Sequence, residues 1–238
     1  MRIPKDQFDE WVVGRQPEDV VPSPSQVAKI AGVSKSSFFF QRSKGYVEGT
    51  VVIALSRAWN LSPVDELMQF EGMGILEAKQ KPTNAEVLSQ IGPEFLLEEL
   101  LSRLRHEDVE YSLPPMPYVN GLKRWLDTVD VHGKYGQFAK AMGLSGTQPL
   151  SRKINDNNLS LGQLITLCDT ANLNARFGLV VTGMMTLEEV GLSRVIREQV
   201  LSEVPGQLVI DALVASRKWL EQEVQVKELE AGVHRNLG

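Results

Sequence analysis

The chain has 238 residues, a single cysteine and a formal net charge of −5 at pH 7, and 42% of its residues are hydrophobic. This length favours two domains of ordinary size, and the composition is that of a globular protein. One cysteine excludes an internal disulfide framework, and no apolar run approaches the roughly 20 residues that span a bilayer. We therefore expect a cytoplasmic protein with neither a signal peptide nor a membrane partner.

Charge is distributed unevenly along the chain. Residues 23–50 and residues 132–160 each hold four Lys or Arg against one acid, whereas residues 86–110 hold seven acids against two Arg. Nucleic-acid binders need a basic face rather than a basic total, so the negative net charge does not exclude a DNA partner. The alternative is that this unevenness is the ordinary variation of helical surfaces.

The hydrophobic spacing of residues 6–70 predicts five short helices. Apolar residues recur every three or four positions over residues 6–13 and 48–59, which predicts a helix in each range. Ser62, followed by a proline, begins a short fifth helix. The second and third helices are expected within residues 23–43.

Residues 23–43 have the pattern of a helix-turn-helix. Ser23 can cap the first of the two helices, because its side chain accepts hydrogen bonds from unpaired backbone N–H groups. Gly32 ends that helix, because a residue without a Cβ adopts the left-handed conformation of a helix end most easily. Ser34 caps the next helix. Ala28, four residues before the glycine, leaves room for the two helices to cross closely.

This pattern resembles the lambda-repressor/Cro-like (XRE-type) helix-turn-helix family over about residues 6–70. The resemblance implies an all-α DNA-binding domain of five short helices. It also implies that the second helix of the motif enters the major groove of double-stranded DNA.

The chain repeats itself at an offset of 111 to 114 residues. Several segments recur in the same order, which argues against chance similarity. The matched pairs include Phe8/Leu122, Trp11/Trp125, Ala28/Ala139, Gly32/Gly143, Ser34/Ser145, Leu55/Leu167 and Leu61/Leu173. Residues 86–101 align with residues 199–214 in the same way, and Gly146 is one extra residue in the turn of the second copy.

We therefore predict an all-α protein with two tandem helix-turn-helix helical bundles, each followed by an amphipathic helical segment. The predicted parts are a first helix-turn-helix domain over residues 1–78, an acidic helical segment over 79–112, a proline-rich linker over 113–118, a second helix-turn-helix domain over 119–190 and a C-terminal helical segment over 191–238. Three prolines within residues 114–117 favour an extended and fairly stiff spacer.

The last helix is expected over about residues 206–230. One stripe of it carries Val209, Leu213, Leu220 and Val224. This stripe fits either a core-facing helix of the second unit or a surface through which two copies of the chain form a homodimer.

The second helix of each motif supplies the candidate residues that contact DNA bases, because a recognition helix presents its N-terminal residues and outer face to the groove. The candidates are Thr147, Gln148, Ser151 and Arg152 in the second unit and Lys35, Ser36, Phe39 and Phe40 in the first. A Gln can pair with adenine and an Arg with guanine, each contributing about 1–3 kcal/mol of discrimination. An exposed Phe can touch a thymine methyl group, and the alternative is that it packs against a neighbouring helix.

Five basic residues are candidate contacts to DNA phosphates, which position a protein on DNA but do not read its sequence. They are Lys29, Arg42, Lys44, Lys140 and Lys153. For each lysine the alternative is an ordinary solvated charge. The first copy departs from the family pattern, since Arg42 stands where the second copy has Ile154, and Phe40 where it has Arg152. Whether the first unit reads bases is therefore open.

The resemblance implies a phage or prophage-type transcriptional regulator that represses by occupying an operator, in a nucleoid-associated location. Because the two recognition helices differ, we expect an operator with two non-identical half-sites. The sequence shows no nucleophile–base pair, metal-ligand spacing or phosphate-binding glycine loop, so we expect neither enzymatic activity, nor a metal, nor a cofactor. The alternative function is a helical protein-interaction module, antitoxin-like or adaptor, in which one or both motifs no longer read DNA.

Overall fold

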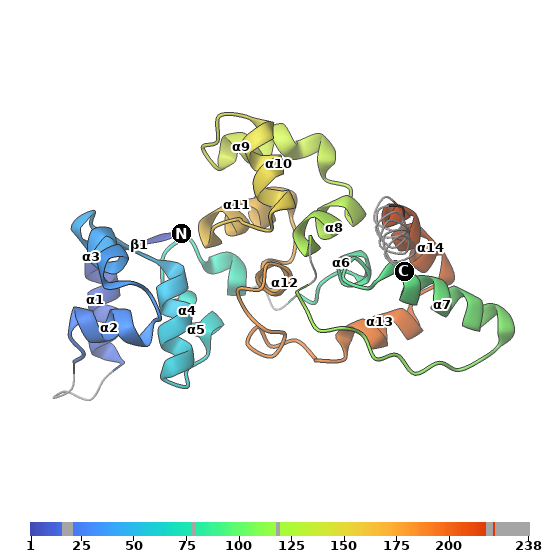
Figure 1. The fold of residues 1–238 in the computed structure, drawn as a ribbon, viewed down its shortest axis with the longest axis horizontal. Coiled ribbons are helices and arrows are strands. Elements are labelled where there is room, and N and C mark those ends of the chain that lie inside the picture. The colour runs from blue at the N-terminus through green and yellow to red at the C-terminus, as the bar shows by residue number, and fades with distance from the viewer. Residues whose placement is uncertain (16–20, 78–79, 118–119, 218–220, 222–238) are drawn as a thin grey trace, which may run out of the picture.

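The computed structural model describes residues 1–15, 21–77, 80–117, 120–217 and 221 (Figure 1). These residues form helices joined by irregular connections of varied length, with a single two-stranded sheet among them. The predicted all-α class is confirmed. Within the same ranges, no helix has both the length and the apolar character to cross a membrane.

The helices follow the same order in the two halves of the chain. In the first half they are α1 (Lys5–Gly14), α2 (Pro24–Ile30), α3 (Lys35–Ser43), α4 (Gly49–Ala58), α5 (Pro63–Leu67), α6 (Asn84–Leu88) and α7 (Pro93–Arg105), with a 3-10 turn η1 (Gly74–Glu77). In the second half they are α8 (Gly121–Thr128), α9 (Tyr135–Ala141), α10 (Thr147–Asn155), α11 (Leu161–Ala171), α12 (Ala175–Val181), α13 (Ile196–Glu203) and α14 (Gly206–Ala215), with a 3-10 turn η2 (His132–Lys134). This correspondence supports the duplication inferred from the sequence.

The sheet was not predicted from the sequence. Strand β1 (Arg2–Pro4) pairs antiparallel with β2 (Tyr46–Glu48), and Ile3 lies opposite Val47. Both of these side chains are fully buried, so the sheet adds two apolar residues to the core beside α1 and α3. Strands of three residues are too short to show an alternating pattern, which is why residue 48 was predicted to begin a helix.

One hydrophobic core runs through both halves of the chain. It includes Phe8, Phe38 and Leu55 from the first half and Trp125 and Phe177 from the second. The residues before α8 therefore do not act as a spacer between two separate cores. Met116, between two of the prolines, packs against this core.

The second hydrophobic cluster joins α6 and α7 to α13 and α14, which lie side by side at one end of the molecule (Figure 1). Its buried residues are Leu88, Ile91, Leu96, Leu201, Val204, Val209 and Ala212. At the repeat offset of 113, three from the first half match three from the second: Leu88 with Leu201, Ile91 with Val204 and Leu96 with Val209. Equivalent residues of the two copies thus pack in one cluster, as they do across the two-fold interface of a homodimer.

Arginines bind the unpaired carbonyl groups at the ends of α6 and α13. Arg124 donates a hydrogen bond to the carbonyl of Ile91 at 2.6 Å. Arg103 donates to the carbonyls of Leu201 and Val204 at 2.7 and 2.8 Å, and its other nitrogen pairs with Glu99. A cation at a helix C-terminus is favoured both by these orphan acceptors and by the helix dipole.

Helix α14 ends at Ala215 within the described residues. Val209 is fully buried against α7, so the core-facing alternative holds at this position of the predicted stripe. Leu213 is half-buried. Leu220 and Val224, the other members of the stripe, lie outside the described residues.

We expect Leu88→Ala and Leu201→Ala each to lower the free energy of unfolding by about 2–5 kcal/mol, because each leaves a cavity in the shared cluster. Both should shift a single transition in urea denaturation followed by circular dichroism. Leu104→Ala is the control, since that side chain lies on α7 but is 78% exposed, and its effect should stay within about 0.5 kcal/mol. Two separate transitions, each sensitive to only one of the buried leucines, would contradict a structure in which the halves fold together.

Candidate nucleic-acid interface

The turns between α2 and α3 and between α9 and α10 have the same backbone geometry. Gly32 has φ of +66° and Gly143 has φ of +67°, a left-handed conformation that favours glycine. In each turn the N–H of the residue after the glycine donates to the carbonyl of the alanine that stands four residues before the glycine, at 3.0 and 2.8 Å. Those alanines, Ala28 and Ala139, are buried, as close approach of the helices requires.

Serine side chains cap the helices around the first turn as predicted. The Ser23 hydroxyl accepts from the backbone of Gln26, whose side chain in turn accepts from the backbone N–H of Ser23. The Ser34 hydroxyl accepts from the backbone N–H of Ser37 at 3.2 Å. In the second turn the inserted Gly146 is the N-cap of α10, with no side-chain cap.

Helix α10 separates an inner from an outer face. Leu150 and Ile154 are buried, four residues apart, as their spacing predicts. Of the predicted base contacts on this helix, three are exposed and one, Ser151, is half-buried. The exposed three are Thr147, Gln148 and Arg152. The structure therefore brings this predicted group together on one side of one helix.

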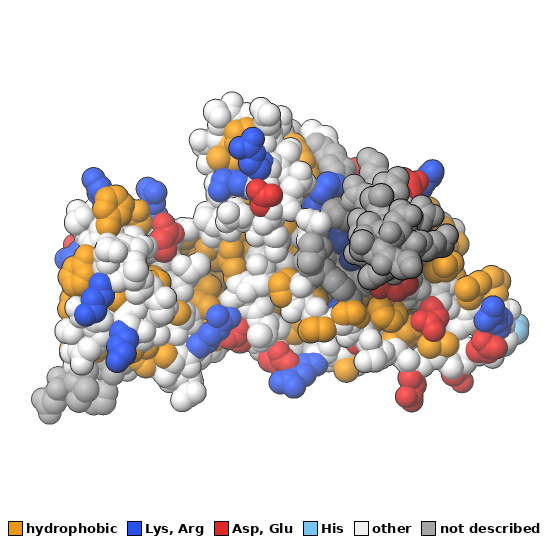
Figure 2. Space-filling model, viewed as in Figure 1, with side chains coloured by type: hydrophobic (Ala, Val, Ile, Leu, Met, Phe, Trp, Pro, Cys, Tyr) orange, Lys and Arg blue, Asp and Glu red, His pale blue; other side chains and the backbone are white. Residues whose placement is uncertain are grey.

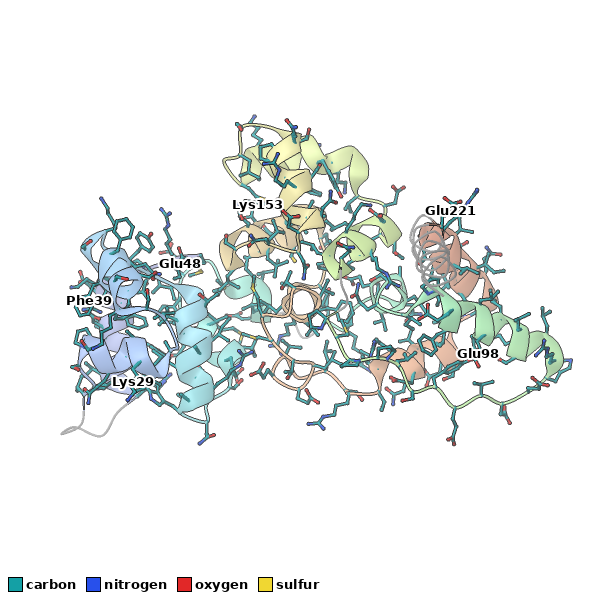
Figure 3. All side chains as sticks on the ribbon, in the orientation of Figure 1. Lys29, Phe39, Glu48, Glu98, Lys153 and Glu221 are labelled. Atoms are coloured by element: carbon teal, nitrogen blue, oxygen red, sulfur yellow. The ribbon has the colours of Figure 1, made fainter. Side chains whose placement is uncertain are left out.

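Helix α3 has the same division, with Phe38 fully buried inside it. Phe39 and Phe40 are 46% and 58% exposed, so neither is buried by a neighbouring helix in the described part of the chain (Figure 3). Lys35 and Ser36 are exposed on the first turn of the same helix. At the offset of 112, these four positions match the four predicted base contacts of α10.

Arg42 has a different environment from the one expected of a phosphate contact. Its guanidinium makes two hydrogen bonds to the carboxylate of Asp9 on α1, one of them at 2.9 Å, and lies 5.6 Å from the centre of the Phe38 ring. The side chain is only 16% exposed. A charged residue at a core-facing position requires such a partner. Arg42 is therefore bound within the protein and is not placed to contact a DNA phosphate, unlike the prediction.

The other predicted phosphate contacts remain available at the surface. Lys29, Lys44 and Lys140 are exposed, and Lys44 lies over the ring of Phe40 at 5.7 Å. Lys153 is half-buried. Figure 2 shows Lys and Arg side chains over α3 and over α9–α10, whereas acidic side chains gather toward α7 and α13. Basic side chains thus lie at both predicted reading helices, although others lie elsewhere on this face.

An ion pair joins the two halves of the chain. Arg57 on α4 pairs with both carboxylate oxygens of Glu189, at 2.6 and 2.8 Å, and donates to the carbonyl of Met184 at 2.7 Å. Hydrogen bonds from this guanidinium hold the pKa of Glu189 below its ordinary value of 4.5. The contact links the helix after α3 to the segment after α12, and so helps to fix the position of one unit relative to the other.

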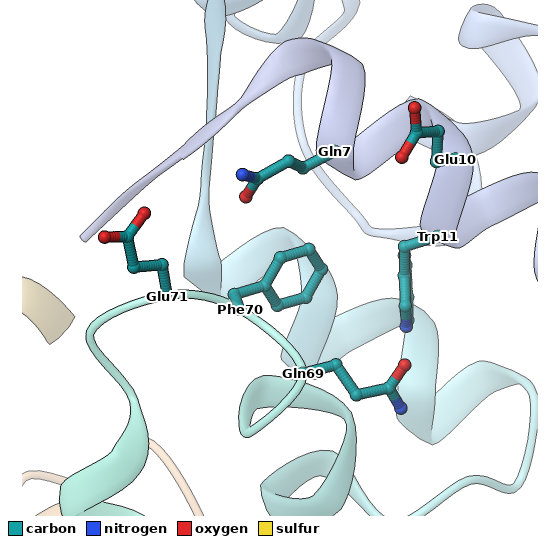
Figure 4. A pocket seen from close by; sticks show the side chains of 6 residues that line it. All are labelled: Gln7, Glu10, Trp11, Gln69, Phe70 and Glu71. Atoms are coloured by element: carbon teal, nitrogen blue, oxygen red, sulfur yellow. The ribbon is translucent and has the colours of Figure 1, made fainter.

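A pocket of about 360 Å³ between α1 and the segment after α5 is unsuited to phosphate (Figure 4). Glu10 and Glu71 contribute carboxylates to its wall. The indole N–H of Trp11, a donor within it, is already bound to Glu66 at 2.6 Å. In the described residues no group of three or more His, Cys, Asp or Glu side chains is arranged to hold a metal ion.

The single thiol, Cys168, is fully buried in the core, as its alignment with Ser56 predicts. Burial raises the pKa of this thiol, which disfavours the reactive thiolate form. Ser56 is also fully buried, and its hydroxyl donates to the carbonyl of Val52. The two equivalent positions therefore both hold small side chains that pack between helices.

No family model, no curated protein and no solved structure matches the chain. The resemblance to the XRE-type family stays a prediction from the sequence.

Glu189→Gln is expected to remove a pH-dependent part of the folding stability. Because the folded-state pKa of this carboxyl is lowered, its charge stabilises the fold above the unfolded-state pKa, and this contribution is lost as the pH falls through the folded-state pKa. Urea unfolding of both proteins from about pH 7 to about pH 3 should show their stability difference shrinking as the pH falls. Arg57→Gln should show the same trend, and a difference that stays constant with pH would contradict the ion pair.

Proposed function

We propose that this chain binds double-stranded DNA sequence-specifically and regulates transcription by occupying an operator. The observation that carries the proposal is a helix–turn–helix geometry that occurs twice, with an exposed outer face on both α3 and α10. An exposed helix of this kind fits the major groove, where each base pair presents a distinct set of donors and acceptors.

The second unit has the side chains for hydrogen-bonded reading of bases. Gln148 and Arg152 are exposed, and their side chains make no hydrogen bond or ion pair within the described ranges. Gln148 can therefore bond the N6 and N7 edge of an adenine, and Arg152 the O6 and N7 edge of a guanine. Lys140 on α9 and Lys153 on α10 are suited to the flanking phosphates.

The first unit offers a different surface to DNA. Phe39 and Phe40 present apolar rings that suit thymine methyl groups, while Lys35 and Ser36 supply polar contacts at the start of the helix. Two unlike reading helices on one chain favour an operator whose two half-sites differ. The shared cluster of α6, α7, α13 and α14 supports the same view, since it already pairs the two copies within one molecule.

This internal pairing reduces the surface available for a homodimer, the alternative that the sequence leaves open for the C-terminal helix. The buried face of α14 packs on α7, which leaves Ile210 and Val214 as its exposed large apolar residues in the described part. Within the described part of this helix, a second chain would have these two exposed apolar residues to bind. We propose that a single chain is the DNA-binding unit.

Exposed apolar residues on the first unit favour a second candidate function. Val13 and Ile30 are 53% and 40% exposed, in addition to Phe39 and Phe40. Such residues are also typical of protein-interaction sites, so the first unit can serve as an antitoxin-like or adaptor surface. In that case only the second unit would contact DNA, and the bound site would contain one half-site.

Selection of bound sequences from a random pool of duplexes should distinguish these functions. The proposed regulator is expected to select an asymmetric site whose two halves have centres about 10.5 base pairs apart, or a multiple of this. Footprinting with the full chain should then protect both halves at a stoichiometry of one chain per site. A symmetric palindrome bound by two chains would overturn the two-half-site proposal, and the absence of any retained DNA at low salt would overturn DNA binding itself.

Two variants of the second unit should separate base reading from phosphate binding. Arg152→Ala is expected to weaken binding to the selected site by about 1–3 kcal/mol and to relax its preference at one base pair. Lys140→Ala should weaken all duplexes alike and reduce the slope of log K against log salt by about 1. Arg105→Ala is the control, an exposed arginine on the acidic side of the molecule, and should change neither quantity. Fluorescence anisotropy with labelled duplexes measures all three.

A further inference from the structure

A cavity of about 500 Å³ lies where the two halves of the chain meet. One wall comes from residues 80–84, which lead into α6, and the opposite wall from α12, α13 and residues 190–193 between them. None of its lining residues belongs to α3 or α10. Its volume lies in the range of pockets that hold small organic molecules, about 300–1,000 Å³.

Part of the cavity wall is apolar. Val190 and Pro82 are buried, and Ile196 and Val200 are half-buried beside them. Aliphatic side chains from both halves of the chain thus form a surface against which the hydrophobic body of a ligand can pack. A purely inorganic ion would leave the exposed parts of Ile196 and Val200 in contact with water.

The charged wall carries two cations and one acid. Arg176 is half-buried and donates to the carbonyls of Leu76 at 2.7 Å and Val190 at 3.2 Å, and its remaining nitrogen lies 4.0 Å from the sulfur of Met68. All three partners are uncharged, and no carboxylate lies within ion-pair distance of Arg176 in the described ranges. Lys81 makes no hydrogen bond or ion pair within the same ranges, and Glu203 is exposed. A half-buried guanidinium without a carboxylate keeps an unbalanced charge, which an anion entering the cavity would neutralise.

We propose that this cavity binds a small organic anion, with its carboxylate or sulfonate group at Lys81 and Arg176 and its apolar body against Ile196 and Val200. Binding of the anion follows from the cavity alone. Its further role, as the effector of the regulator, rests on the proposed function. Because the walls come from both halves, a bound ligand bridges them and changes how α3 is held relative to α10, and hence the affinity for an operator with two half-sites.

The probe for this site is 8-anilinonaphthalene-1-sulfonate, an anion with an apolar body whose fluorescence rises in an apolar environment. A titration of the full chain is expected to show one saturable site. Lys81→Met and Arg176→Met should each weaken binding about tenfold or more, the loss expected for a hydrogen bond to a charged group. Arg194→Met is the control, an 81% exposed side chain near the cavity that pairs with Glu188, and it should leave the affinity unchanged.

Lys81→Met decides the result if Arg176→Met fails to fold. The Lys81 side chain is exposed and makes no hydrogen bond or ion pair in the described ranges, so its replacement should not disturb the fold. The uncharged N-phenyl-1-naphthylamine should bind at least tenfold more weakly than the sulfonate and should not respond to Lys81→Met. Equal binding of the two probes would overturn the proposal. A second result would also overturn it: sulfonate binding that is unchanged by Lys81→Met but abolished by the double variant Leu97→Lys with Leu101→Lys. The probe would then lie on the exposed apolar residues of α7.

The effector role has a separate readout. Saturating sulfonate should change the affinity of the wild-type chain for its selected duplex about tenfold, and should not change that of Lys81→Met. An unchanged affinity would overturn the effector role while the fluorescence result upholds the anion site. If the chain retains no DNA, the proposed function fails, and the anion site is decided by the fluorescence titration alone.

Discussion

The packing of repeat equivalents against each other is the constraint on which the rest of the structure depends. Leu88 and Leu201 occupy matching positions in the two copies and lie in one buried cluster. A single copy would leave this apolar face exposed, and burying it stabilises a pair of copies by the hydrophobic effect. The arginines that bind the carbonyl ends of α6 and α13 satisfy polar groups that the close packing removes from water. Joining the copies in one chain makes this pairing intramolecular, so it does not depend on protein concentration.

The same pairing determines what the remote ends of the two copies can do. The helices around the two similar turns, α2 with α3 and α9 with α10, belong to the larger core. Arg57 with Glu189 adds a polar contact between the two halves. Under the proposed function, two recognition helices held on one shared core lose less freedom on binding DNA than two independent domains joined by a linker. The proposed recognition of two unlike half-sites depends on this shared core more than on the strength of either helix alone.

Local signals made much of this architecture predictable. Capping serines such as Ser34 and the turn glycine Gly32 act within a few residues of themselves, so their effect can be read from the sequence. Features made by distant residues were missed. The pairing of Arg42 with Asp9 joins residues 33 positions apart, and the three-residue strands of the sheet have no periodicity of their own. Met116 was assigned to a spacer because the prolines around it dominate the local pattern, whereas its burial is decided by the fold.

The difference between Arg42 and Ile154 also explains why the two reading helices need not contribute equally. Ile154 packs in the core and leaves Arg152 on the outer face with its charge available. Arg42 is bound by Asp9, so α3 keeps no free arginine for a base, and its outer face carries Phe39 and Phe40 instead. A wrong base leaves a hydrogen-bonding side chain unsatisfied when it is buried in the groove, whereas an apolar ring loses only a modest contact. Under the proposed function, the second unit would therefore set most of the sequence preference, and the first would add affinity and the direction in which the chain lies on DNA.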